Sequence, residues 1–92
     1  MEKEVIQVMV HILAKLTRME KIGSAHTEIT NLSKGLPIHF RSNKKGKKII
    51  QRAIKELFDR DYLLQKPSTG EIHVSLNPKK FSEIGEFIFR FR

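Results

Sequence analysis

The fold is decided by a stretch of twenty residues that reads RSNKKGKKIIQRAIKELFDR from Arg41 to Arg60. Apolar side chains recur in this stretch at spacings of three and four, which is typical of a helix with one buried face; they are Ile50, Ala53, Ile54, Leu57 and Phe58. Basic side chains cluster on the other side of the same helical wheel, and they are Lys45, Lys48, Arg52 and Lys55. Either Ser42 or Asn43 can cap the first turn by accepting a hydrogen bond from a free backbone N–H. The stretch therefore predicts a helix over residues 43–60 that is apolar on one side and strongly basic on the other.

The positive charge of the whole chain is concentrated in this stretch. The formal net charge is +8 at pH 7. Residues 41–60 hold eight Lys or Arg against two acidic residues, whereas residues 1–40 and residues 61–92 each hold five against four. A charge that served solubility alone would be spread over the surface. Its concentration on one helix predicts a polyanionic partner and favours nucleic acid over a merely solvated face.

Length and composition exclude several classes of protein. The chain has 92 residues, which suit one small domain, and 39% of them are apolar, enough for a single core. It contains no cysteine, which excludes a disulfide framework, thiolate catalysis and cysteine-based zinc sites. No apolar run approaches the roughly 18 residues of a membrane span, and the acidic start Met1–Glu4 lacks the basic region of a secretory signal. We therefore expect a soluble, cytoplasmic, single-domain protein.

Motifs for catalysis and metal binding are missing from the sequence. There is no Gly-rich phosphate loop, no Ser-His-Asp spacing and no close pair of carboxylates in an apolar setting. The histidines do not pair at ligand spacing and no acidic cluster joins them; they are His11, His26, His39 and His73. We therefore expect no enzyme, no cofactor and no metal site. His26 is interpreted as a helix-start residue and His73 as a strand residue.

The residues before the basic helix predict two further helices. Residues 3–21 predict a long helix, because apolar side chains recur at helical spacing over more than half of its circumference. A helix that is apolar over this width usually packs on two sides. Residues 27–34 predict a short helix that Thr27 caps and Gly35 ends. Residues 38–41 are interpreted as a connector with two apolar anchors, because the preceding proline forbids continuation of a helix.

The residues after the basic helix predict a hairpin and a closing segment. Residues 61–66 are strand-like, residues 67–70 are typical of a turn, and residues 71–76 alternate polar and apolar side chains, which together indicate two paired strands. Residues 79–90 fit both a helical and a strand period, and we favour a helix. The predicted fold is α+β and mostly helical, with three helices in the core, a two-stranded wing and a C-terminal helix.

This order of elements resembles a winged helix-turn-helix domain. The likeness extends from Val5 to Ile88 and is carried by three stretches: TEITNLSKGLP from Thr27 to Pro37, AIKELFDRDYL from Ala53 to Leu63, and VSLNP from Val74 to Pro78. The chain looks like the small bacterial and archaeal transcriptional regulators of the MarR, ArsR and PadR kind. In such proteins the third helix reads DNA and the wing touches the adjacent backbone. One departure is an excess of about nine residues over 38–46, which either lengthens the recognition helix or forms a basic loop before it.

The resemblance and the charge together predict an interface with double-stranded DNA. The residues expected to face DNA are Arg41, Ser42, Asn43, Lys44, Lys45, Lys47, Lys48, Gln51, Arg52 and Lys55 from the helix, and Arg60, Lys66 and Thr69 from the wing. Arg52 suits the two-pronged contact with guanine, and Gln51 or Asn43 the paired contact with adenine. The lysines around Gly46 are expected to bind phosphates, and this glycine is expected to let backbone N–H groups approach a phosphate. The predicted function is that of a DNA-binding transcriptional regulator.

Two other functions stay open on the sequence alone. A winged-helix module can contact another protein through the same helix and wing. RNA binding would use the same charge, but it usually adds exposed aromatic side chains that stack on bases. The only aromatic residue of the basic stretch from residue 41 to 60 is Phe58, which lies on the predicted buried stripe, so RNA is less favoured.

The apolar residues at the two ends of the chain predict a homodimer. Four of the six phenylalanines lie in the last twelve residues, and with the wide stripe of helix 3–21 they form more apolar surface than so small a body covers. The predicted interface consists of Ile6, Val10, Leu13, Phe87, Ile88 and Phe91. Such a dimer would set two basic helices against a two-fold symmetric DNA site. The alternatives are that Phe81 closes the core while the other phenylalanines lie over helix 3–21, or that a ligand pocket lies between them.

Overall fold

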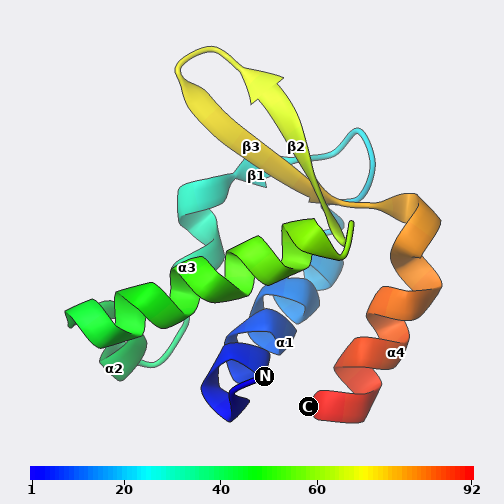
Figure 1. The fold of residues 1–92 in the computed structure, drawn as a ribbon. Coiled ribbons are helices and arrows are strands. Elements are labelled where there is room, and N and C mark those ends of the chain that lie inside the picture. The colour runs from blue at the N-terminus through cyan, green and yellow to red at the C-terminus, as the bar shows by residue number, and fades with distance from the viewer.

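The computed structural model describes all of residues 1–92 and has an α+β fold of four α-helices and one small antiparallel sheet (Figure 1). The predicted α+β, mostly helical class is confirmed. None of the helices combines the length and the apolar character needed to cross a membrane. In chain order the elements are α1 (Lys3–Arg18), β1 (Thr27–Glu28), η1 (Ile29–Ser33), α2 (Ile38–Arg41), α3 (Lys44–Asp59), β2 (Leu63–Ser68), β3 (Glu71–Leu76), η2 (Pro78–Lys80) and α4 (Phe81–Phe91), where η marks a 3-10 helix.

Helix α1 forms the centre of the molecule. It packs against α3 and against α4, and also contacts β3 and η1 (Figure 1). Its fully buried side chains are Val5, Val8, Met9, Ile12, Leu13 and Leu16. The wide apolar stripe seen in the sequence is therefore covered from two sides by helices of the same chain.

The sheet has the strand order β1–β3–β2, with both pairs antiparallel. Strands β2 and β3 form the predicted hairpin, in register from Leu63 opposite Leu76 to Ser68 opposite Glu71. Strand β2 runs two residues further than expected, so the predicted four-residue turn shrinks to Thr69 and Gly70. Gly70 adopts a φ of 74°, a left-handed conformation that glycine reaches without strain. Figure 1 shows the hairpin projecting beyond the helices.

The predicted helix over residues 27–34 is wrong in its first part and only partly right in the rest. Strand β1 occupies the start, where it pairs with β3, and the following η1 is a 3-10 helix of five residues. Thr27 does not cap a backbone N–H; its hydroxyl oxygen accepts a hydrogen bond from the side-chain amide of Asn31 at 2.9 Å. A helix of two turns is marginal by itself. As a strand, Thr27 and Glu28 form backbone hydrogen bonds with β3, and these bonds would be lost if a helix began at residue 27.

Two other boundaries differ from the prediction. Helix α1 ends at Arg18 rather than at residue 21, and Glu20 turns the chain with a φ of 55°. Residues 38–41, predicted as a connector, form the one-turn helix α2, and Pro37 occupies its N-cap. A proline cannot continue the preceding segment but is compatible with a helix start, because its missing N–H would have no helical partner there. The extra residues 38–46 are thus α2 and the first turn of α3, neither a basic loop nor a simple extension of the recognition helix.

Helices α3 and α4 agree with the prediction. Asn43 caps α3, and the helical interpretation of residues 79–90 is confirmed by η2 and α4. The buried stripe of α3 is shifted slightly: Ile49 belongs to it, whereas Ile54 and Phe58 are only half-buried.

Candidate nucleic-acid interface

The start of α3 is fixed by a capping asparagine and a buried glycine. The Gly46 N–H donates to Asn43 Oδ1 at 2.8 Å, and the Asn43 amide donates to the carbonyl of His39 at 3.2 Å. A Cβ at Gly46 would collide with the backbone carbonyl groups of His39 and Phe40 in α2. The expectation that Gly46 opens the backbone to a phosphate is therefore wrong, because α2 covers it. Asn43 uses both ends of its amide at the cap, which leaves Gln51 for a paired contact with adenine.

All ten residues predicted to face DNA from residues 41–55 are exposed. Within this set, Lys44, Lys48 and Arg52 follow one another at spacings of four along the exposed surface of α3. Six cations have no acidic side chain within ion-pair distance, and they are Arg41, Lys44, Lys45, Lys47, Lys48 and Arg52. We call these six the α3 cation set. It gives the exposed side of α2 and α3 a positive charge that the protein itself does not neutralise.

Lys55 differs from these cations because it has an acidic partner one turn away. Its Nζ donates to Asp59 Oδ2 at 2.7 Å. The hydrogen bond to the Asp59 carboxylate, and then the charge of that carboxylate, raise the pKa of Lys55. Both side chains are exposed to water, and exposed ion pairs are weak. A phosphate can therefore replace Asp59 at Lys55 at little cost.

Arg60 does not belong to the wing, contrary to the prediction. It follows α3 directly, and its Nε lies 3.6 Å from a carboxylate oxygen of Glu56. Its guanidinium lies over the rings of Tyr62 and Phe87, at 6.0 and 5.2 Å from the ring centres. Because Phe87 is in α4, Arg60 joins the end of α3 to α4 rather than to the hairpin.

The other two wing residues lie in the hairpin but in different settings. Lys66 is opposite His73 in the register of β2 and β3, so it shares a sheet face with His73 and not with the buried Leu63. Thr69 lies at the tip and is exposed. The structure therefore leaves Thr69 as the wing residue at the end of the projecting hairpin.

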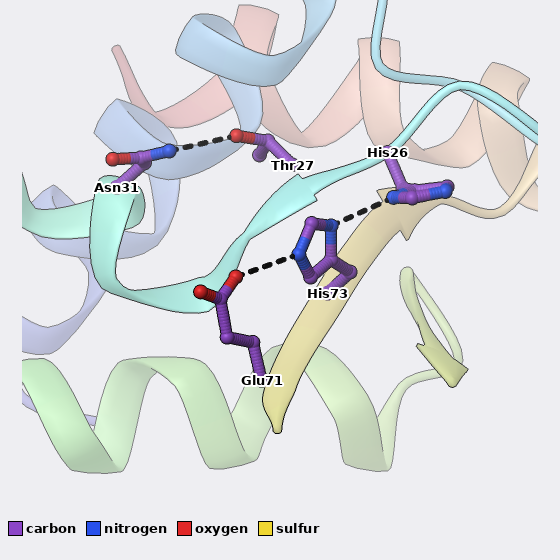
Figure 2. Close-up of polar contacts among 5 residues, drawn as sticks. All are labelled: His26, Thr27, Asn31, Glu71 and His73. Carbon is purple, nitrogen blue, oxygen red and sulfur yellow. Dashed lines mark hydrogen bonds and ion pairs between the residues drawn. The ribbon is translucent and has the colours of Figure 1, made fainter. Parts of the chain in front are cut away.

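Two histidines that are distant in the sequence meet at the sheet (Figure 2). The Nδ1 atoms of His26 and His73 lie 2.8 Å apart, and His73 Nε2 lies 3.1 Å from Glu71 Oε2. One proton between the two Nδ1 atoms makes the first bond, while the Nε2–H of His73 donates to the carboxylate. The interpretation of His26 as a helix-start residue is wrong, because the chain there runs into β1. No three His, Asp or Glu side chains are arranged to hold a metal ion.

Polar side chains of α1 hold the segment that leads into α2. Lys15 Nζ donates to the carbonyl oxygens of Asn31 and, at 2.8 Å, Lys34, and His11 Nε2 lies 3.3 Å from the same Lys34 oxygen. Burial lowers the pKa of His11, and the bond to the backbone of Lys34 opposes this shift. Burial also lowers the pKa of Lys15, and the charges of Lys34 and Arg18 add to that effect. The segment that connects α1 to α2 and α3 is thus held in place by these side-chain contacts as well as by the core.

The predicted dimer surface is divided by the structure. Leu13 and Phe87 are buried within the single chain, so their assignment to an interface is wrong. Ile6, Val10 and Ile88 are half-buried against the core, and Phe91 is exposed. Three of these residues, Ile6, Val10 and Phe91, line an open groove of about 500 Å³ between α1 and α4.

Comparison of the chain with protein-family models, with curated proteins and with solved structures finds no match. The likeness to winged-helix regulators stays a prediction from the sequence.

Proposed function

We propose that the protein is a winged helix-turn-helix domain that binds double-stranded DNA and regulates transcription. The order of elements supports this assignment: a helix, a short strand, helical turns, a basic helix, a hairpin and a closing helix. The short strand β1 pairs with β3 and not with β2, so the sheet joins the segment before α2 to the base of the hairpin. In the proposed binding mode α3 enters the major groove of the DNA, and Thr69 at the hairpin tip approaches the adjacent DNA backbone.

The observation that carries the proposal is the α3 cation set. These side chains are exposed and without acidic partners, while the opposite side of α3 is buried against α1. The basic strip from Lys44 to Lys55 extends over roughly 16 Å at 1.5 Å per residue. The major groove is about 12 Å wide and admits a helix of this kind. Phosphates on both sides of the groove would then neutralise the charge that the protein leaves unpaired.

The residues of α3 divide into two roles under this proposal. Arg52 and Gln51 lie midway along the helix, where side chains reach base edges. Arg52 can donate two hydrogen bonds to guanine, and Gln51 can donate one to adenine and accept one from it. The four lysines of the first turns each carry a compact charge on a long side chain, and they bind phosphates and set the orientation of the protein on the duplex. Arg52→Ala should therefore reduce discrimination among sequences by about 1–3 kcal/mol, with a smaller effect on non-specific duplex.

The salt dependence of duplex binding tests the proposal directly. If the five cations other than Arg52 meet phosphates, log K should fall with log salt at a slope of about −4.5, which is a loss of roughly 500-fold in affinity from 50 to 200 mM salt. Fluorescence anisotropy of a labelled duplex measures this slope. Replacing Lys44, Lys45, Lys47 and Lys48 by Ala should make the slope shallower by about 0.9 for each phosphate that the variant no longer neutralises.

A matched control removes four charges from elsewhere on the surface. The control variant carries Ala at Lys3, Arg18, Lys34 and Lys79, all of which are exposed and lie outside α2, α3 and the hairpin. Its net charge equals that of the test variant, so a general attraction to a polyanion would weaken equally in both. Equal slopes for the two variants would contradict a specific role for α3.

Single-stranded DNA and structured RNA are included in the same titration. If the protein binds single-stranded DNA or RNA more tightly than duplex DNA, its function is single-strand or RNA binding and not the reading of duplex DNA. Failure to bind any of the three nucleic acids at low salt would refute the proposal and favour a protein partner for α3 and the hairpin.

A further inference from the structure

Helix α4 has an apolar side that faces away from the core. Its inner side contributes the buried residues Ile84 and Phe87, which pack toward α1. Another set recurs at spacings of four, three and one on the outer side, and consists of Phe81, Gly85, Ile88 and Phe89. We call this set the outer strip. Its phenylalanines are 44% exposed at residue 81 and 76% exposed at residue 89, and Ile88 is half-buried.

Gly85 lies in the middle of the outer strip and leaves it flat. A Cβ built on Gly85 would meet no atom within 4 Å, so the position borders open space. Phe81 lies four residues before it and Phe89 four residues after it, about 6 Å away on either side along the helix. The strip therefore has a large ring, a flat centre and a second large ring.

We propose that the outer strip is a self-association surface, on which α4 of a second copy of this chain packs antiparallel about a two-fold axis at Gly85. Reversal of the strip about its centre places Phe81 of one copy beside Phe89 of the other, and the same contact repeats across the axis. The two glycines face each other and allow the helices to approach closely. An isologous interface needs a patch with this two-fold symmetry, because the patch must be complementary to itself.

The charges of α4 favour a second copy as the occupant over a charged partner. Glu83 and Arg90 lie off the outer strip, whereas Glu86 borders it three residues before Phe89. Arg92 borders its C-terminal end, and its guanidinium lies 5.7 Å from the ring centre of Phe89 within the same chain. The four residues of the strip itself carry no charge, so contact between the rings can leave Glu86 and Arg92 at the rim in water. A strip without charges matches an identical strip.

The size of the strip sets the expected strength of the dimer. A phenylalanine buries about 150–250 Å² in full, so the exposed parts of the two rings offer roughly 200–300 Å² in each copy. A stable interface buries about 800 Å² on each side. The residues that flank the strip must contribute, and the dimer belongs to the weak, transient class.

Sedimentation equilibrium without nucleic acid measures the association independently of DNA binding. The apparent mass should rise from 10.7 kDa at a few micromolar toward twice that value at several hundred micromolar. Phe89→Glu and Phe81→Glu should each weaken association at least tenfold, while circular dichroism shows an intact helix content. Ser24→Glu adds the same charge at an exposed connector position and should associate like the wild type.

An engineered cysteine tests the register of the two helices. The chain has no cysteine, and a disulfide forms only where the Cα atoms come within about 7 Å. Gly85→Cys should give a covalent dimer on mild oxidation, whereas Glu83→Cys on the opposite side of α4 should give no covalent dimer. A monomer at several hundred micromolar overturns the proposal. Wild-type association in Phe81→Glu and in Phe89→Glu would also overturn it, and would place the interface at the groove between α1 and α4.

Discussion

Replacing Gly46 by alanine should destabilise the protein, although alanine is the better helix former. Within a helix, alanine is favoured over glycine by about 0.5–1 kcal/mol. At Gly46 the added Cβ would lie 2.6 Å from the carbonyl oxygen of His39 and 2.6 Å from the carbonyl carbon of Phe40. These are backbone atoms of α2, so relief requires α2 to move, and overpacking of this kind costs about 1–3 kcal/mol. Three backbone atoms lie closer than 3.0 Å to the added Cβ, which puts the cost in the upper half of this range. After the gain in helix propensity, the balance is a loss of about 1–2 kcal/mol, equivalent to a fall in Tm of roughly 5–15 °C.

Urea titration followed by far-UV circular dichroism, at a few micromolar protein, measures this loss. Gly85→Ala is the matched control, because its Cβ would meet nothing within 4 Å and the helix should gain about 0.5–1 kcal/mol. Both substitutions restrict the unfolded chain to the same degree. The difference between the variants therefore isolates the contact of α2 with α3. A Gly46→Ala protein as stable as the wild type would refute the close approach that the structure shows.

Three further perturbations test the contacts around α3. Lys15→Met should lower the free energy of unfolding by about 1–2 kcal/mol in urea titration, because it removes a charged donor from two carbonyl oxygens; no loss would mean that Lys15 does not hold η1. Asp59→Asn should steepen the salt slope of duplex binding by up to about 0.9, since it frees Lys55 for a phosphate, and an unchanged slope would exclude that contact. Burial lowers the pKa of His11 below its ordinary 6.5, so between the folded value and 6.5 the unfolded chain binds more protons, and stability should rise as the pH rises through that window and level off above it. His11→Gln should remove this part of the pH dependence, and identical stability–pH curves for the two proteins would contradict it.

Sequence patterns predicted the elements that depend on local periodicity. Helix α3 follows from the spacing of Ile50, Ala53 and Leu57, and its start from a capping side chain at Ser42 or Asn43, of which the structure uses Asn43. The closing segment fits both a helical and a strand period, and the favoured helix is the one that the structure contains. These signals lie within a few turns of chain, so no knowledge of the partner is needed to read them.

The elements that sequence patterns missed depend on partners distant in the chain. Strand β1 has two residues, and its conformation is set by pairing with β3 more than 40 residues later. The contact of His26 with His73 exists only because of that pairing. Gly46 carried a correct signal of close approach, but the backbone that approaches it is α2 and not a phosphate. A glycine shows that space is needed at its Cα and does not show what fills the space.

The width of the apolar stripe on α1 explains why the predicted dimer surface is wrong in part. A stripe over more than half of a helix needs two partners. The sequence cannot distinguish a second helix of the same chain from a helix of another copy, because both bury the same residues. Here α3 and α4 supply both partners, and Leu13 is consequently buried inside one chain. Packing the inner side of α4 on α1 leaves Phe81 44% exposed and Phe89 76% exposed. The apolar excess from which the sequence predicts a dimer therefore persists on the outer strip of α4, one helix further from the centre of the molecule.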